Sequence, residues 1–303
     1  MPAPSNAIIT PMRSLRFFLG AVVISFLTAC APVSAQSPET STITTIENKG
    51  SDTMVNLALA WAETYQKLHP EVNLSVTGGG SGTGIASLQN GTADIANASR
   101  SMKEEEANDL RAKGLEPVEH IVARDAIAVI VNPSNPVQQL SLQQVSDIYS
   151  GKINNWIEVG GEDRPIVRLS RETNSGTHVY FLETVLRLGD KENQTLFSTD
   201  TLLLPSSVGI ISEVRDNPNA IGYDGLGYVT DEVKMVALSA NPGEIYVLPS
   251  AETVNQDLYP VARDLYIYTA GEVSSEVQDY LDWIGGADAQ AIVQELGFVP
   301  INP

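Results

Sequence analysis

Three short runs of β-branched and other apolar residues in this sequence each end in a turn rich in serine, threonine and glycine, and each turn opens a helical pattern. The runs cover residues 43–46, 72–76 and 166–169. Strands that alternate with helices are typical of βαβ units, which build parallel or mixed sheets with helices on their faces. The sequence therefore predicts an α/β protein from residue 43 onward.

The composition fits a globular protein of this class and restricts its partners. Hydrophobic residues make up 43% of the 303-residue chain, enough for a large core, and the length suits two domains or one large α/β unit. Lysine and arginine number 18 against 37 aspartates and glutamates, a formal charge of −19 that repels nucleic acid and anionic lipid. One cysteine, Cys30, and three widely spaced histidines, His69, His120 and His178, form no zinc pattern, so we expect neither a metal nor a cofactor.

The first residues have the organisation of an export signal. Arg13 and Arg16 precede an apolar run at residues 17–27, which is too short for a membrane-spanning helix of about 20 residues. We therefore expect residues 1–29 to be a signal peptide. The mature protein would then lie on the periplasmic or cell-surface side of a bacterial membrane.

Residues 27–30 resemble the bacterial lipobox, in which signal cleavage leaves a lipidated cysteine at the N-terminus. In that interpretation Cys30 carries a lipid anchor, and residues 30–42 form a flexible tether rich in small and polar residues. The alternative is ordinary signal cleavage after residues 33–35. Apart from the anchor we expect no membrane contact, and we expect a monomer.

The first two turns offer hydrogen-bond donors to an anion. At residues 49–54, Ser51 or Asp52 can cap the following helix, which leaves the amides and hydroxyl near Thr53 available. The second turn, residues 77–84, holds five glycines, whose amides can converge on one ligand. It has neither the Walker nor the dinucleotide-binding glycine spacing, so a tight turn without a ligand is the alternative.

The third turn adds a positive charge. Residues 171–177 follow the third strand and open another helix, with Arg171 four residues before Ser175. Helix N-termini hold anions through unpaired N–H groups and the positive end of the helix dipole, so a chain of charge −19 can still bind one. Three such helix ends that meet in one cleft, with an arginine that grips two oxygens, predict a site for a small tetrahedral oxyanion.

The motifs around these turns resemble those of the phosphate-binding proteins of bacterial phosphate-specific ABC transporters, a family with the type II periplasmic-binding-protein fold. The matching segments run in order along nearly the whole mature chain, at residues 50–53, 80–84, 91–100, 142–156, 171–177 and 297–300. The resemblance implies two α/β lobes, each with a central mixed sheet, and a ligand in the interlobe cleft. Residues 43–125 and 259–303 would form lobe I, and residues 126–258 would form lobe II.

The resemblance also implies a function and a ligand set. The expected function is high-affinity binding of inorganic phosphate and its delivery to the permease subunits of an ABC transporter for uptake, without catalysis. The residues at the family's ligand positions all come from the three turns: Thr53, the Met54 amide, Ser81, Arg171, Ser175, the Gly176 amide and Thr177.

One position departs from the enterobacterial pattern of the family. There, the segment matching residues 97–100 ends in an aspartate that accepts the proton of monohydrogen phosphate, whereas this chain has Arg100. We expect Asp125, just before an apolar strand at residues 126–131, to supply the missing acceptor, since an acceptor disfavours fully ionised sulfate. Asp125 could instead be a surface carboxylate at the hinge or the partner of Arg100, and both residues are candidates for the site. Asp52 is a weaker candidate for the missing proton acceptor, because we expect it to cap its own helix.

Other functions compete with phosphate uptake. The same fold can bind sulfate or molybdate, or act as a phosphate sensor. A phosphohydrolase using Ser81 or Ser175 is the enzymatic alternative, but the sequence offers neither a metal-ligand cluster nor a general base for it. His178 has no acidic partner and no nucleophile-elbow motif beside it, so we expect a packing or surface residue.

Overall fold

The computed structural model describes residues 43–301. The signal peptide predicted at residues 1–29, the tether at residues 30–42 and the lipid-bearing Cys30 lie outside the described residues. In the part of the chain that is described, no helix is long and apolar enough to cross a membrane.

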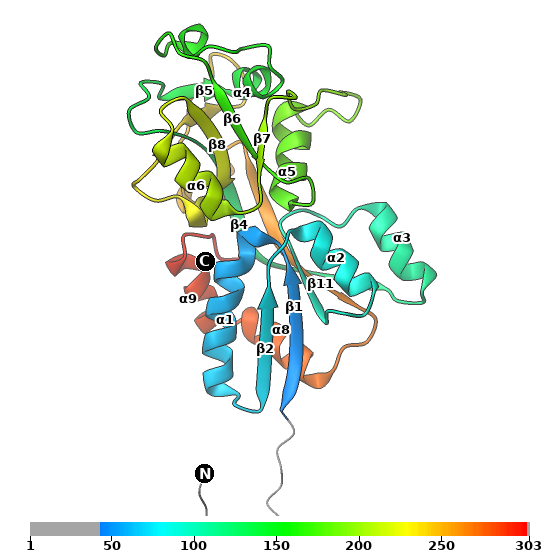
Figure 1. Cartoon of the computed structure of the whole chain (residues 1–303). Coiled ribbons are helices and arrows are strands. Elements are labelled where there is room, and N and C mark those ends of the chain that lie inside the picture. The colour runs from blue at the N-terminus through cyan, green and yellow to red at the C-terminus, as the bar shows by residue number, and fades with distance from the viewer. Residues whose placement is uncertain (1–42, 302–303) are drawn as a thin grey trace, which may run out of the picture. The chain divides into compact units, whose positions relative to one another are not determined.

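A mixed β-sheet with helices on both faces organises the chain (Figure 1). Within residues 43–301 its strands are hydrogen-bonded in the order β2-β1-β3-β11-β4-β8-β6-β7, with β9 also paired to β4. These strands are β1 (Thr44–Gly50), β2 (Val72–Thr77), β3 (Ile95–Ala98), β4 (Pro117–Val131), β6 (Val167–Arg171), β7 (Leu202–Leu204), β8 (Ala220–Gly225), β9 (Lys234–Met235) and β11 (Ala262–Ala270). A separate parallel pair consists of β5 (Gln139–Ser141) and β10 (Ala237–Ser239).

Both directions of pairing occur in each part of this sheet. β1 runs parallel to β2 and β3, whereas β11 runs antiparallel to β3 and β4. β6 runs parallel to β7 and β8, and β8 runs antiparallel to β4. The mixed α/β fold predicted from the sequence is therefore confirmed.

The strand β4 joins the two parts of the sheet. It pairs with β11 as far as Ala126 and with β8 from Ile127 onward. The two mixed sheets expected from the sequence are therefore parts of one hydrogen-bonded path. The sequence pattern predicted only the second half of β4, because residues 117–124 mix exposed charged side chains with apolar ones and lack an apolar run.

We call the elements that pack on the first part of the sheet lobe I, and those on the second part lobe II. The helices of lobe I are η1 (Asp52–Met54), α1 (Val55–Leu68), α2 (Ser81–Gln89), α3 (Glu104–Ala112), α8 (Ser275–Ile284) and α9 (Ala287–Glu295). The helices of lobe II are α4 (Leu142–Tyr149), η2 (Trp156–Val159), α5 (Gly176–Phe181), the π-helix η3 (Leu182–Leu186), α6 (Ser207–Asp216), η4 (Leu226–Tyr228) and α7 (Ala251–Asn255). The residue boundaries given above for two separate lobes stay a prediction.

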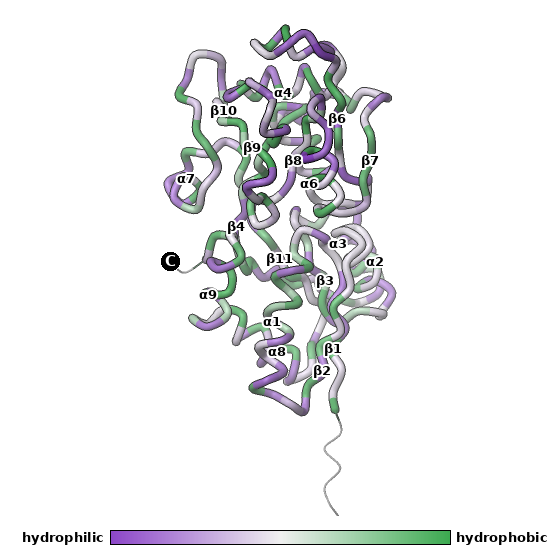
Figure 2. Tube along the Cα trace, turned by 60° about the vertical axis from the view of Figure 1, so that its left-hand side comes forward, coloured by the Kyte–Doolittle hydropathy of each residue, from purple (hydrophilic) through white to green (hydrophobic). Residues whose placement is uncertain are grey.

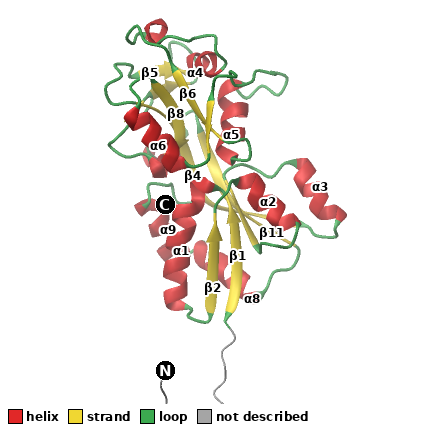
Figure 3. Cartoon of the chain, viewed as in Figure 1, coloured by secondary structure: helices red, strands yellow, loops and turns green. Residues whose placement is uncertain are grey.

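Each lobe has its own hydrophobic core. In lobe I, α1 and α9 bury side chains such as Trp61 and Val293 against the sheet. In lobe II, α4 and α5 bury side chains such as Tyr149 and Phe181. Figure 2 shows hydrophobic stretches along the strands, and Figure 3 shows the helices that flank them. The chain length suited two domains or one large α/β unit, and one continuous sheet carries both of these cores.

Candidate functional site

Three helix starts from distant parts of the chain meet where lobe I faces lobe II. Thr53 in η1 and Thr177 in α5 are in direct contact, with 2.8 Å between their hydroxyl oxygens. The Gly82 amide at the start of α2 donates to the Asn174 carbonyl oxygen of lobe II at 3.1 Å. Thr53, Ser81 and Thr177 are all buried. The predicted convergence of the three turns is therefore present.

Glycine is required at two positions where these turns approach other parts of the chain. Gly50, before η1, has a φ of +144°, and a Cβ there would lie 2.1 Å from the Asn97 carbonyl oxygen. A Cβ on Gly176 would lie 2.3 Å from Ser81 Oγ. Glycine at position 176 therefore allows the start of α5 to lie directly against the start of α2.

The starts of α2 and α5 present donors that the helices themselves do not use. The first amides of a helix have no partner within it, which applies to Gly176 and Thr177 in α5. Ser81 Oγ accepts a hydrogen bond from the Ser99 amide at 3.0 Å, which leaves the Ser81 hydroxyl proton for another acceptor. The Met54 amide donates at 3.0 Å to a backbone carbonyl of its own turn.

Ser175 precedes α5 at the N-cap position. Its side chain makes no capping hydrogen bond to the helix, although serine commonly caps in this way. The Ser175 hydroxyl is therefore available to another partner.

The guanidinium of Arg171, at the end of β6, is enclosed by protein groups. It donates to the Ser207 hydroxyl at 2.8 Å, to the Pro205 carbonyl at 2.9 Å and to the Asp52 carboxylate at 2.9 Å. Asp224 lies 3.7 Å away as a second anion. Nε of Arg171 is buried and has no protein partner among the described residues. Arg171 can therefore still donate one hydrogen bond to an anion.

Asp224 on β8 is completely buried beside this arginine. Burial raises the pKa of the Asp224 carboxyl to about 6, while Arg171 acts in the opposite direction. One carboxylate oxygen accepts hydrogen bonds from the Ser207 hydroxyl and the Gly225 amide. The group thus balances the charge of Arg171 at a cost in desolvation.

The expectation that Asp52 or Ser51 caps its own helix is wrong. No side-chain cap occurs at the start of η1 or α1. Oδ2 of Asp52 instead accepts hydrogen bonds from Arg171 and from the Ser207 amide, each at 2.9 Å. A carboxylate bonded to a guanidinium and a helix start is stabilised more strongly than one bonded to a single amide, which explains the difference.

A second buried arginine, Arg263 on β11, was not found by sequence reasoning. Its Nη2 donates to Thr177 Oγ1 at 3.0 Å and to Asp125 at 2.9 Å, and lies 3.5 Å from Thr53 Oγ1. Its Nη1 donates to the Ser99 carbonyl at 2.8 Å. Arg263 therefore contacts both lobes at the point where their helix starts meet.

One sequence signal could have identified Arg263. In β11 the buried side chains alternate, and this period of two places Arg263 on the same face as Leu265 and Ile267. A cation at an inward position of an apolar strand requires an anionic partner. The pattern therefore indicates a buried ion pair, but it does not tell which carboxylate completes it.

That carboxylate is Asp125, which lies within β4 and not before the strand. It is fully buried, and its Oδ1 accepts a hydrogen bond from the Leu226 amide at 3.0 Å. Burial raises the pKa of Asp125, and the adjacent Arg263 partly opposes this effect. Both alternatives considered for Asp125 are wrong, because it is neither at the surface nor paired with Arg100.

Arg100 points toward the start of α3. Its two terminal nitrogens donate to the two carboxylate oxygens of Glu106 at 2.8 and 2.7 Å. A Cβ on Gly82 would lie 3.9 Å from Arg100 Nη2, so the guanidinium borders the start of α2. Arg100 therefore lies next to the start of α2, with its terminal nitrogens engaged by a neighbouring carboxylate.

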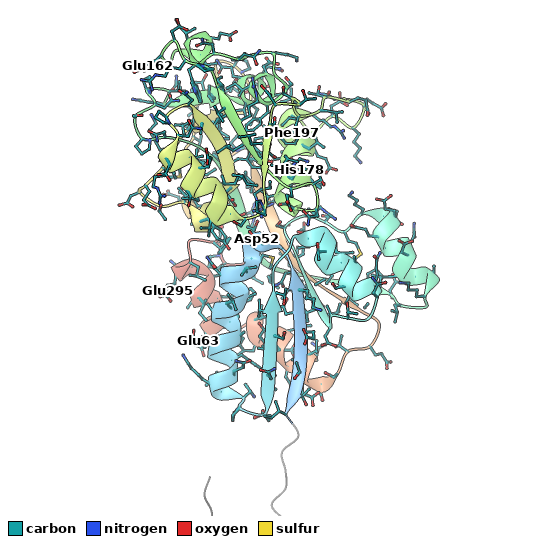
Figure 4. All side chains as sticks on the ribbon, viewed as in Figure 1. Asp52, Glu63, Glu162, His178, Phe197 and Glu295 are labelled. Carbon is teal, nitrogen blue, oxygen red and sulfur yellow. The ribbon has the colours of Figure 1, made fainter. Side chains whose placement is uncertain are left out.

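His178 is a packing residue, as the sequence predicted. Its ring stacks on Phe197 with 4.6 Å between centroids, and Figure 4 shows the two side chains near each other in lobe II. Nδ1 of His178 lies 3.0 Å from Ser170 Oγ. Burial lowers the pKa of His178, which favours the neutral ring.

Two α/β lobes that bring three helix starts and two buried arginines to one junction are the parts of a two-lobed binding protein. The model of the PBP superfamily domain matches residues 35–287. The chain belongs to this superfamily and, within it, to the family of the PstS phosphate-binding proteins.

Similar proteins come from several bacteria. The chain is 32% identical over 273 residues to the phosphate-binding protein PstS of Pseudomonas aeruginosa, covering 84% of this chain and 83% of that protein. It is 33% identical over 254 residues to PstS of Bacillus subtilis, covering 84% and 79%.

Solved structures of similar fold are also binding proteins of phosphate transport. A substrate-binding protein from Clostridium perfringens, whose structure holds phosphate, has a TM-score of 0.76 and 32% identity, covering 86% of this chain and all (100%) of that one. An ABC-type phosphate transport receptor from Vibrio cholerae has a TM-score of 0.67 and 28% identity, covering 84% and 99%.

Proposed function

We propose that this protein binds inorganic phosphate outside the cytoplasmic membrane and delivers it to the permease subunits of an ABC transporter. The observation that supports this most directly is the junction of three helix starts with Arg171 and Arg263. Helix N-termini and buried guanidinium groups favour a compact oxyanion with several acceptor oxygens.

The proposed ligand set combines groups from both lobes. Lobe I supplies Thr53 and Ser81, and Asp125 lies beside them on β4. The Met54 amide, which was also expected in the ligand set, is already bonded to the Ser51 carbonyl. Lobe II supplies the Arg171 Nε group, the Ser175 and Thr177 hydroxyls and the Gly176 amide. Arg263 adds a second cation between the lobes. Arg100 belongs to the site as a neighbouring charge, because Glu106 already occupies both of its terminal nitrogens.

Asp125 would provide the selectivity for phosphate over sulfate. Monohydrogen phosphate carries a proton that a carboxylate can accept, whereas sulfate at neutral pH carries none. Asp125 lies near Thr53, because a Cβ on Gly225 would be 2.7 Å from Asp125 Oδ2 and 3.0 Å from Thr53 Cγ2. Its pairing with Arg263 keeps the carboxylate available in a buried place.

The test of this proposal is a competition titration. Isothermal titration of the phosphate-free protein with phosphate, sulfate and molybdate, each alone and in competition, should show tight binding of phosphate only. Preference for sulfate or molybdate would instead assign the protein to another oxyanion. Tight phosphate binding without stimulation of uptake in transporter-containing vesicles would favour the sensor alternative.

A phosphohydrolase is the enzymatic alternative, and the contacts of the two candidate serines do not favour it. His178 lies on Ser170 and not on Ser175, and the hydroxyl of Ser81 lies near that of Ser99. Within residues 43–301 no group of three or more His, Cys, Asp or Glu side chains is placed to hold a metal ion. We therefore propose a binding protein and expect no turnover of an aryl phosphate.

We further infer that the protein is exported, lipid-anchored through Cys30 and monomeric. The charged and apolar pattern of residues 1–29 and the lipobox-like residues 27–30 support the export and the anchor. A tether at residues 30–42 would allow the lobes to reach a permease in the same membrane.

A further inference from the structure

We propose that Asp52 is a positioning residue that holds the two lobes together and thereby sets the rate at which a bound anion leaves. The inference about the lobes depends on their contacts alone. The inference about the anion rests on the function proposed above.

One residue of lobe I makes three hydrogen bonds to three elements of lobe II. The carboxylate oxygen Oδ2 of Asp52 accepts from Arg171 Nη2 and from the Ser207 amide, each at 2.9 Å. The carbonyl oxygen of Asp52 accepts from the Tyr228 hydroxyl, also at 2.9 Å. Figure 4 shows Asp52 at the junction of the two lobes, whereas Glu63 lies farther along α1. These bonds connect β6, α6 and η4 of lobe II to a single turn of lobe I.

Lobe II itself holds two of the partners of Asp52, Arg171 and Ser207, in place. Arg171 bonds to Pro205 and to the Ser207 hydroxyl, and that hydroxyl donates to Asp224 at 2.9 Å. The Ser207 amide is the first of α6, so it has no partner within the helix and lies at the positive end of its dipole. Asp52 therefore binds to donors that lobe II already positions, namely the Arg171 guanidinium and the first amide of α6, when the lobes come together.

Separation of the lobes would break these bonds and leave the Arg171 charge with one carboxylate fewer. An anion held by helix starts from both lobes can leave only after the lobes separate. A contact that stabilises the closed arrangement slows this separation. Removal of the Asp52 contact should therefore raise the dissociation rate of the anion.

The sign of the effect distinguishes this role from a simple charge effect. A carboxylate near an anion site repels the ligand, so removal of its charge alone would strengthen binding. Removal of a closing contact would instead speed the release of the anion. Asp52→Asn changes the charge by one unit and preserves the size of the side chain, so it separates the two possibilities.

The first measurement follows inorganic phosphate binding and release by stopped-flow fluorescence. Hydrogen bonds to charged groups contribute enough that Asp52→Asn should raise the dissociation rate about tenfold. Tyr228→Phe, which removes the hydroxyl that donates to the Asp52 carbonyl, should raise the dissociation rate by a smaller factor. Glu63→Gln makes the same charge change at an exposed carboxylate paired only with Lys67, and should leave both rates as in the parent. Tighter binding by Asp52→Asn, or an unchanged dissociation rate, would overturn the proposal.

The second measurement needs no ligand. Small-angle scattering of the phosphate-free proteins should give a larger radius of gyration for Asp52→Asn and Tyr228→Phe than for the parent and Glu63→Gln. Equal radii would refute the role of Asp52 between the lobes. If the two variants have the larger radius of gyration but neither they nor the parent bind phosphate, Asp52 still holds the lobes together and the proposed function is refuted. If circular dichroism shows that Asp52→Asn does not fold, Tyr228→Phe decides both measurements.

Discussion

The hydroxyl oxygens of Thr53 and Thr177 lie 2.8 Å apart, although 124 residues separate them in the chain. Each belongs to a helix start on a different lobe, and Arg263 Nη2 lies within 3.5 Å of both. The two lobes therefore share one polar junction. A substitution on either side of it is expected to alter both ligand binding and the contact between the lobes.

Replacement of Arg171 by alanine should weaken phosphate binding by about 2–5 kcal/mol, because the anion would lose a buried cationic donor. Isothermal titration calorimetry measures this loss. Arg215→Ala is the matched control, since Arg215 is exposed and pairs with Asp216 and Glu232 at the C-terminal end of α6 and beyond. Near-parental affinity of Arg171→Ala would remove Arg171 from the site.

Asp125→Asn should reverse part of the discrimination between phosphate and sulfate. The amide offers a donor where the carboxylate accepts the proton of monohydrogen phosphate, so phosphate affinity should fall and sulfate affinity should rise. Parallel titrations with both anions at one ionic strength test this while general charge effects are held constant. If both affinities equal those of the parent, Asp125 is outside the site.

Arg263→Gln should lower the free energy of unfolding by about 3–5 kcal/mol, because it leaves the fully buried Asp125 without its cation. Urea denaturation measures the change. The double variant with Asp125→Asn should lose less than the sum of the single losses, since it removes both charges of the pair. Additive losses would show that the two side chains do not depend on one another.

The stability of the protein should depend on pH through Asp224. Its pKa is raised from 3.8 to about 6 by burial, so the folded protein binds this proton more tightly than the unfolded chain. Lowering the pH from 7 to 4 should therefore raise the free energy of unfolding of the parent relative to Asp224→Asn, by on the order of 2 kcal/mol. Urea denaturation at several pH values gives this difference.

The control for that pH series is Asp216→Asn. The pKa of the exposed Asp216 is lowered by Arg215. The ionised Asp216 therefore stabilises the folded protein at neutral pH, and this stabilisation should be lost as the pH falls. The difference between the parent and Asp216→Asn should thus change in the direction opposite to that for Asp224→Asn. The same trend in both variants, or a pH-independent difference for Asp224→Asn, would contradict the assignment.

Cys30→Ser should release the protein from the membrane, because a single thiol would carry the lipid. Membrane fractionation and N-terminal sequencing measure this. Unchanged fractionation with an N-terminus at Gln36 would indicate ordinary signal cleavage after residues 33–35.

The chemistry of the candidate site was largely predictable from the sequence. Unpaired amides at a helix start are a local property of the backbone, and the turns at residues 49–54, 77–84 and 171–177 mark such starts by composition alone. Their meeting depends on the tertiary structure, because β6 runs antiparallel to β1 and β2, and the three turns come together only where β4 joins the two parts of the sheet. Arg263 was missed since it lies in a strand, away from any turn.

What the sequence determined by itself is the alternation of strands and helices, the places where the helices begin and the kinds of donor found there, because each depends on residues close together in the chain. Only the tertiary structure decided which charges pair. Asp52 bonds to Arg171 across 119 residues and Arg263 to Asp125 across 138, whereas Arg100 takes Glu106, six residues away. A buried ion is stable only beside its counter-ion, and which carboxylate is available depends on how distant strands and lobes come together.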